Sequence, residues 1–513
     1  MACKADIILK VLAESTHLVK LVYLYATLSR MKHKYPLTLK VFFATELWER
    51  YGFYTVQALL ALYLLLRFHY SDDHIYSMVG AFTAMAYISP FFGGFIADYW
   101  LGHKRAVLWG AAVLALSYFS IVLVHNIDGI ILALGGITIG TGLLKPNISS
   151  LLAHEYHTKT PEGSRDGAFT LFYVGISCGI ILGTTVPTLL KDWLGWNAPF
   201  IGATIGLILA YITFWWGCRY YEVHHQPDYT HCTIADYLKS LLGIVAYIGI
   251  AYLIIHNVMI ADIAFAIIAA LSVIVVLAVA FKEEKHQRHR TIVFLLLCII
   301  SVMFWGLYFQ MFLSLTLFIY RTVQPTIFGI EFPPPFYVTA ESIGLVVFGP
   351  ILAWLWTRLR QRNKRITTPM KFFYAMLVMT LSYGLILYAT YQVDPNVRLS
   401  PWLIILAYLL ISISELLLSP VGLSVTTKLV RKEVVGMMVG VFFVSLGIGS
   451  KLANMLSDVA AIPKHLDQFS KVEHIYQHAF WFYFESAIAA TVISFILVLV
   501  IKRLMRANTL EHF

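Results

Sequence analysis

Three charged side chains lie inside an apolar run that is long enough to cross a membrane. Glu46, Glu49 and Arg50 fall in the string ATELWERYGFYTVQALLALYLLL, within the run from Phe42 to Leu66. Charges buried in lipid are costly, so these are expected to face a protein interior or a water-filled cavity. Glu46, Arg50 and Tyr54 are four residues apart, which places them on one helix face where Glu46 and Arg50 can pair. The segment predicts a polar pathway through a membrane.

The chain as a whole has the composition of a membrane protein. Of its 513 residues, 59% are hydrophobic and 13% are charged, which is about half the charged share of a soluble domain. The apolar runs lack the alternation of barrel strands, so they predict a single α-helical domain that crosses the membrane many times. The net charge of +10 lies mainly in loops, which indicates membrane topology rather than nucleic-acid binding. The five cysteines show no metal-ligand spacing.

Fourteen runs of about 20 residues are long enough to span a bilayer. They are 41–67, 76–97, 105–125, 129–153, 168–190, 198–218, 234–255, 258–281, 291–319, 336–357, 371–391, 401–424, 434–460 and 479–502. The run 234–255 is the least secure, because Asp236 and Lys239 shorten its apolar core. The basic cluster between Arg358 and Lys371 marks a cytoplasmic loop, and alternating spans then place both termini in the cytoplasm.

The spans divide the chain into two bundles of six helices. The predicted division is an amphipathic N-terminal segment (1–40), a first bundle (41–218), two inserted helices with linkers (219–290), a second bundle (291–505) and a tail (506–513). The N-terminal segment has one apolar helical face, typical of a helix at the membrane surface. Met31 is an alternative to Met1 as the start of the protein.

A faint repeat relates the two bundles. LLKPNIS (143–149) and LLSPVGLS (417–424) fall in the fourth span of each bundle, and both place a polar residue before a proline. Proline interrupts helix hydrogen bonding. Helices broken at matching positions of two halves are how many secondary transporters build a site at the bilayer midplane.

Longer motifs resemble a known transporter family. GGFIADYWLGHKR (93–105) resembles the loop signature of the major facilitator superfamily. ELWERYGFY (46–54), GTGLLKPNIS (140–149), RDGAFTLFYVGISCG (165–179) and SELLLSPVGLSVTTKL (414–429) resemble, in order, motifs of the proton-dependent oligopeptide transporter (POT/PTR) family. The resemblance implies an all-α membrane protein with the major facilitator fold, two six-helix bundles plus two inserted helices. It also implies uptake of di- and tripeptides with protons by alternating access.

The charged residues in these motifs suit a zwitterionic peptide. Arg50 and Lys145 are basic residues at midspan, and a cavity of low dielectric strengthens their attraction for a carboxylate. Glu415 lies in the opposite half and can take the ammonium group. The resemblance implies the same roles, and it matches Tyr54 and Tyr87 with tyrosines that line the pocket. A structural Lys145–Glu415 ion pair in the empty site, and simple packing of Tyr87, are the alternatives.

Glu46, Glu49 and Glu415 are the expected proton carriers. A carboxyl group removed from water holds a proton more readily, and a nearby cation opposes this effect. A peptide carboxylate on Arg50 would therefore release a glutamate to take up a proton. One charge moving through about 100 mV supplies about 2.3 kcal/mol, which is enough to drive accumulation. The sequence has no nucleotide-binding GxxxxGK[ST] motif, so we expect protons as the coupling ion and no cofactor.

Several positions depart from the family pattern. Phe309 precedes Gln310 where many members carry an acid, and Gln57 replaces its partner arginine, a double change that resembles the bacterial dipeptide and tripeptide permease branch. Because both the acid and its partner arginine are replaced, no buried charge is left without a counter-charge. The remaining departures among the expected substrate-binding residues are Ser177 and Glu341, at positions of asparagines, and Phe442, at the position of a tryptophan.

Glu341 adds negative charge to the half expected to bind the amine. We expect it to face the cavity, where it either favours cationic substrates or supplies a second proton site; the alternative places it in the extracellular mouth. The expected partners are small peptides and membrane lipid but no nucleic acid, and the expected protein is a monomer in the bacterial inner membrane. The alternative functions are transport or export of another amino-containing metabolite, and nutrient sensing without transport. No HExxH motif suggests an enzyme.

Overall fold

The structure is a computed structural model that describes residues 37–158, 162–220, 223, 232–362, 366–392, 398–463 and 469–506. The predicted amphipathic segment falls almost wholly outside this part of the chain, as does most of the predicted tail. Across the described residues, fourteen helical spans are long and apolar enough to cross a membrane, as the sequence predicted.

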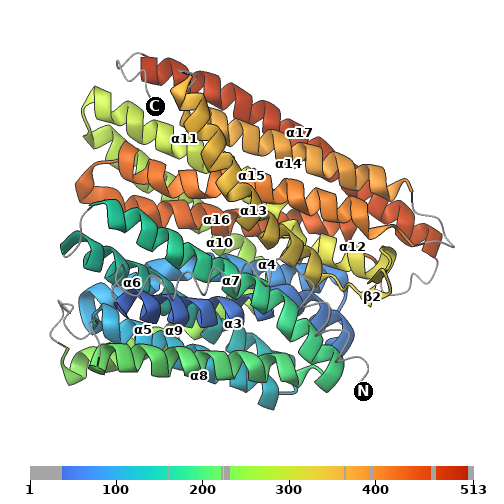
Figure 1. The fold of residues 1–513 in the computed structure, drawn as a ribbon, viewed down its shortest axis with the longest axis horizontal. Helices are drawn as coiled ribbons and strands as arrows, with labels where there is room; N and C mark the ends of the chain where they lie inside the picture. The colour runs from blue at the N-terminus through green and yellow to red at the C-terminus, as the bar shows by residue number, and fades with distance from the viewer. Residues whose placement is uncertain are drawn as a thin grey trace.

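The first bundle contains the helices drawn in blue to green in Figure 1. They are α3 (Leu37–Phe68), α4 (Asp72–Ile96), α5 (His103–Leu123), α6 (Ile127–Thr158), α7 (Glu162–Leu194) and α8 (Asn197–Tyr220). The turn after α4 is a short π-helix, Ala97–Leu101, where the Asp98 carboxylate lies 3.7 Å from the His103 ring. Gly93 of α4 allows a close helix contact, because a Cβ there would lie 1.9 Å from the Gly142 oxygen of α6.

The second bundle lies beside the first and is drawn in yellow to red in Figure 1. Its helices are α11 (Lys285–Tyr308), α12 (Ser314–Thr322), α13 (Pro335–Gln361), α14 (Thr368–Thr390), α15 (Pro401–Leu429), α16 (Val435–Ser457) and α17 (Phe469–Arg506). Short 3-10 helices cover Phe309–Phe312, Lys432–Val434 and Asp458–Ala460, and a hairpin pairs β1 (Thr326–Ile327) with β2 (Ile330–Glu331).

The two inserted helices, α9 (Ile234–His256) and α10 (Val258–Lys282), form a hairpin that contacts both bundles. The Tyr247 hydroxyl of α9 donates to the Met85 carbonyl of α4 at 3.0 Å. On α10, Asp262 pairs with Lys451 of α16 at 2.6 Å. Asp236 does not disturb α9, because it lies in the first turn and closes a capping box with the preceding threonine.

The helices are not broken at the repeated prolines. α6 continues through Pro146 and α15 continues through Pro420. Membrane helices tolerate proline where neighbouring helices and side chains satisfy the freed backbone groups. The break lies instead in the seventh span, predicted as one run at 291–319, where the 3-10 segment Phe309–Phe312 separates α11 from α12.

The two bundles meet along α4 and α16 and along α7 and α13. The Ser450 hydroxyl of α16 donates to the Gly80 carbonyl of α4 at 3.0 Å. The Thr339 hydroxyl of α13 contacts the Thr184 hydroxyl of α7 at 2.7 Å. These contacts set the relative position of the two bundles, whose helices α3, α4, α6, α13 and α15 carry most of the predicted site residues.

Candidate functional site

Arg50 on α3 forms its main ion pair with the adjacent Glu49. Its Nη2 donates to Glu49 Oε1 at 2.6 Å, and its Nε donates to Glu49 Oε2. Glu46, predicted as the partner, is also paired, but its Oε1 lies 3.5 Å from Arg50 Nε. Glu49 is the closer partner because its two oxygens match the planar fork of the guanidinium group.

The two glutamates are held differently. Glu49 receives a further bond from the Thr141 hydroxyl of α6 at 3.1 Å. Glu46 is buried, and its Oε2 has no hydrogen-bond partner among the described residues. A buried polar atom without a partner carries a desolvation cost. Glu46 is therefore the less well compensated acid of the two.

The close packing of α3 on α7 fixes the position of Arg50. Gly179 of α7 lies against α3 so tightly that a Cβ there would be 2.7 Å from Arg50 Cβ and 2.6 Å from the Leu47 oxygen. The guanidinium carbon lies 5.0 Å from the centroid of the Phe53 ring. Helix packing and an aromatic face thus hold the guanidinium group inside the first bundle.

Lys145 on α6 belongs to the same cluster. It interacts electrostatically with Glu46, Glu49 and Arg50, and its Nζ lies 5.9 Å from the centroid of the Tyr87 ring. Its side chain is half-buried. The first bundle therefore brings together two cations and two acids from the motifs singled out in the sequence.

The second bundle contributes two further acids. Glu415 on α15 and Glu341 on α13 interact directly through their carboxyl groups, and the Tyr308 hydroxyl of α11 interacts with Glu415. Glu341 is 2% exposed, and the Ser342 hydroxyl donates to its Oε2 at 3.2 Å. Within the described residues, Glu341 Oε1 and Glu415 Oε2 have no hydrogen-bond partner.

Tyr54 and Tyr87 are close to both sets of charges. Both tyrosines interact electrostatically with Arg50 of the first bundle and with Glu415 and Glu341 of the second. Opposite charges from the two bundles thus reach one group of aromatic side chains, here called the aromatic layer. Among the ion pairs of the described residues, none joins Lys145 to Glu415, so the alternative of a structural bond between them is not seen in this conformation.

Three other predicted residues have different surroundings. Gln310 is fully buried, and its side chain bonds the Ala453 carbonyl at 2.8 Å and two serine hydroxyls. The Ser177 hydroxyl donates to the carbonyl four residues earlier in its own helix at 3.2 Å. Phe442 packs on Gly422, where a Cβ would lie 2.2 Å from the ring. The polar groups of Gln310 and Ser177 are therefore used within the protein.

Sequence reasoning missed part of the aromatic layer. The Tyr87 ring lies 5.3 Å from Phe309 and 6.4 Å from Trp305, measured between ring centroids. Trp305, Tyr308 and Phe309 all fall in the string FWGLYFQMFLSLTLF. The many aromatic residues beside Gln310 in that string could have predicted that they pack near Tyr87.

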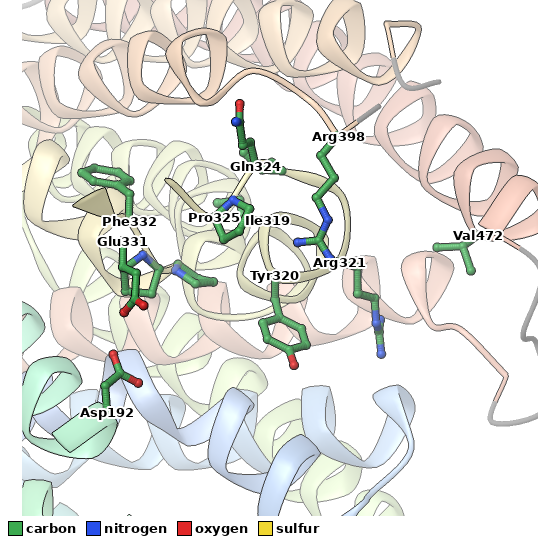
Figure 2. A pocket seen from close by; sticks show the side chains of 13 residues that line it. Asp192, Ile319, Tyr320, Arg321, Gln324, Pro325, Glu331, Phe332, Arg398 and Val472 are labelled. Carbon is green, nitrogen blue, oxygen red and sulfur yellow. The ribbon is translucent and has the colours of Figure 1, made fainter. Parts of the chain in front are cut away.

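A second ion pair joins the bundles near the turn between α3 and α4. Arg321 Nη1 lies 2.7 Å from Asp72 Oδ2, and Arg321 Nη2 lies 2.8 Å from Asp72 Oδ1. A cavity of about 560 Å³ lies at this end. Its lining includes Arg321, Arg398, Asp192 and Glu331 (Figure 2). This lining includes none of the residues that the sequence predicted to bind substrate or protons.

Comparison with known proteins shows which family the sequence matches. The sequence model of the POT family matches residues 104–473. Dipeptide and tripeptide permease B of Salmonella typhimurium is 32% identical over 473 residues, which are 92% of this chain and 96% of the permease. Dipeptide and tripeptide permease A of Serratia proteamaculans is 30% identical over 480 residues, with 92% of each chain covered.

Two solved structures share the fold. Tetrameric PepTSo2 has a TM-score of 0.78 at 26% identity, with 92% of this chain and 99% of that chain covered. A peptide transporter POT in complex with sulfate has a TM-score of 0.78 at 24% identity, with 92% of this chain and 96% of that chain covered. The arrangement of helices is thus that of solved peptide transporters.

Proposed function

Because the chain belongs to the POT family, we propose that it is a proton-coupled symporter that takes up di- and tripeptides by alternating access. The observation that carries this function is that charges of opposite sign, from the two bundles, reach the same tyrosines of the aromatic layer. Arg50 and Lys145 come from the first bundle, and Glu415 comes from the second. This is the charge pattern that complements a peptide with a free carboxylate and a free ammonium group.

The peptide would bridge the two bundles. Its carboxylate binds Arg50 and Lys145, where exclusion of water strengthens charge-assisted hydrogen bonds. Its ammonium group binds Glu415. Tyr54 and Tyr87 combine an aromatic face with a hydroxyl, which suits peptide side chains of different kinds. A ligand that contacts both halves favours the conformations in which they are close, as alternating access requires.

Proton coupling would run through the first bundle. A peptide carboxylate competes with Glu49 and Glu46 for the Arg50 guanidinium group. The glutamate that loses this partner is a buried acid without a cation, and it takes up a proton. Glu46 is the better candidate of the two, because Glu49 keeps the bond from Thr141.

We assign the conformation to the state that opens toward the cytoplasm. The basic segment between α13 and α14 marks the cytoplasmic end, so the Asp72–Arg321 pair lies at the external end and closes it. Both termini would then be cytoplasmic, in a bacterial inner membrane. One chain supplies both halves of the site, so the monomer is the proposed transporting unit.

Uptake into proteoliposomes tests this function. With an acidic exterior and a negative interior, the full-length protein should accumulate radiolabelled alanyl-alanine above its external concentration, and a protonophore should abolish the gradient. Arg50→Gln should raise the half-saturating concentration by about tenfold or more, through loss of a charge-assisted contact. The control Arg358→Gln, at an exposed arginine, should behave as wild type.

The same assay separates the rival functions. Peptide binding without accumulation under a proton gradient would indicate a sensor. Accumulation of another amine that unlabelled dipeptides do not inhibit would indicate a different cargo. Either result would overturn peptide symport.

A further inference from the structure

The acids of the second bundle form a pair that lacks a cation. Glu341 and Glu415 interact directly, come from different helices and each keep one buried oxygen without a hydrogen bond among the described residues. Within the same part of the chain, no lysine, arginine or histidine forms an ion pair with either acid. Glu46 and Glu49 differ in this respect, because both share Arg50.

The titratable groups that face the pair are tyrosine hydroxyls. They come from four helices and are Tyr308 on α11, Tyr54 on α3, Tyr87 on α4 and Tyr408 on α15. A tyrosine hydroxyl is neutral near pH 7, so none of these groups supplies the missing positive charge.

The other groups near Glu341 and Glu415 do not supply a positive charge either. On the α7 side, threonine hydroxyls contact Thr339, two residues before Glu341 in the chain. The cations that reach the tyrosines are Arg50, which Glu49 already engages, and Lys145, whose Nζ lies over the Tyr87 ring. Both cations come from the first bundle.

Two carboxylates in contact cannot both stay ionised away from water without strong repulsion. Carboxyl pairs in such positions share one proton and titrate as a unit. By this rule, we expect the pair to share one proton and to carry one negative charge when no peptide is bound. A single ammonium group neutralises that charge and leaves the proton in place.

We propose that Glu341 and Glu415 form a cation-exchange site, in which the shared proton is replaced by a second positive charge on the peptide. The proposal rests on peptide transport as the function. With alanyl-alanine, the ammonium group binds and the proton stays. With a peptide whose first residue is lysine, the α-ammonium and the side-chain ammonium each bind one carboxylate, and the proton leaves to water. Only the carboxyl O–H bond breaks, and its proton is the single product.

The exchange makes Glu341 a determinant of which peptide charges the site prefers. A cationic side chain next to the α-amine competes with a proton, so its binding should improve as the pH rises. A cationic side chain at the other end of the peptide lies toward Arg50 and Lys145, where it gains nothing from the pair. Lysyl-alanine and alanyl-lysine have the same composition and charge, so they form a matched pair of probes.

The first test measures competition against radiolabelled alanyl-alanine in proteoliposomes. In wild type, the ratio of inhibition constants of alanyl-lysine to lysyl-alanine should rise from about pH 5.5 to about pH 7.5, as the shared proton becomes easier to displace. Glu341→Gln should lower that ratio about tenfold and remove its pH dependence, because one charged contact is lost. Glu341→Asp should retain the wild-type ratio and its pH dependence. The control Glu433→Gln, at an exposed residue, should match wild type. A ratio that Glu341→Gln leaves unchanged overturns the proposal.

The second test needs no variant and no transport. Purified full-length protein in detergent, weakly buffered with a pH indicator, is titrated with each peptide from a stock at the same pH. Saturating lysyl-alanine should release about one proton more than saturating alanyl-lysine, as the shared proton leaves. Equal release from the two peptides overturns the exchange. Failure of wild type to accumulate alanyl-alanine would instead overturn the transport function, so the two failures are distinguishable.

Discussion

Asp72 and Arg321 join the two bundles through a bidentate ion pair, although 249 residues separate them in the chain. Asp72 is 2% exposed and also accepts the Ile462 backbone N–H at 3.0 Å, while Arg321 donates to the Tyr476 hydroxyl at 2.9 Å. At the family positions for an ion pair between the halves, this chain has an uncharged glutamine and phenylalanine. A charged link between the bundles is made instead at the start of α4.

Breaking this pair should impair transport. Asp72→Asn leaves Arg321 without its counter-charge and should weaken the externally closed state, so uptake of alanyl-alanine should fall severalfold. Arg321→Gln should have a similar effect, and the double variant should be no worse than either single one. A coupling of about 1–3 kcal/mol is expected, less than for a fully buried pair, because the Arg321 side chain is 21% exposed.

The neighbouring Asp73 provides the control. Its carboxylate lies 3.1 Å from the His74 ring, and both side chains are more than half exposed. Exposed pairs contribute little, so Asp73→Asn should leave uptake unchanged. Equal losses in Asp72→Asn and Asp73→Asn would contradict a gating role for Arg321.

Glu46→Gln should abolish proton-driven uptake but not the exchange of peptide across the membrane. A glutamine cannot carry the proton, so accumulation under an acid gradient should disappear. Exchange of labelled for unlabelled alanyl-alanine needs no net proton movement, so it should persist. The matched control is Glu284→Gln, at an exposed residue before α11. Loss of exchange together with accumulation would show that Glu46 supports the site rather than proton transfer.

Gly179→Ala should destabilise the first bundle. The new methyl group would meet Arg50 and the Leu47 carbonyl at less than van der Waals distance, and overpacking of this kind costs about 1–3 kcal/mol. The thermal unfolding midpoint in detergent should therefore fall. Gly249→Ala on α9 has open space around the new methyl and should be neutral or stabilising, because alanine favours helix. Equal midpoints for the two variants would argue against tight packing of α3 on α7.

Asp262→Asn should destabilise the contact between the inserted hairpin and the second bundle. It leaves the Lys451 ammonium group, on a side chain 8% exposed, with its bond to the Asn454 oxygen. The Asp262 side chain is 47% exposed, but a buried lysine that loses its counter-charge is still costly, and replacing both residues removes that cost. The double variant Asp262→Asn with Lys451→Met should thus unfold at a higher temperature than Asp262→Asn alone. If the double variant is the less stable one, Lys451 does not depend on Asp262 for its charge compensation.

Much of the fold could be predicted because its signals are local. Apolar runs of the right length identified all fourteen spans. Charges within them pointed to Arg50 and Lys145, which interact electrostatically in the first bundle. Glu341 is 2% exposed and interacts with Glu415, and its position in a substrate cavity stays a prediction. The binding and proton-carrying roles of these residues stay predictions.

Other features had no local signal. The further bond that Glu49 receives comes from Thr141, on another helix. The break at Phe309–Phe312 contains neither proline nor glycine, and the backbone of the following leucine leaves the helical region there. The surroundings of Gln310 come from α16, more than a hundred residues later in the chain. Each of these depends on side chains that meet only after the helices have packed.

The hairpin of α9 and α10 has a consequence for the range of motion. One arm is tied to α4 through Tyr247 and the other to α16 through Asp262, so the hairpin spans the seam between the bundles. Asn257, which leaves the helical conformation between the two arms, is the natural pivot. Rocking of one bundle against the other must either flex the hairpin at Asn257 or slide an arm along its neighbour. We therefore expect the hairpin to limit how far the two bundles can move apart.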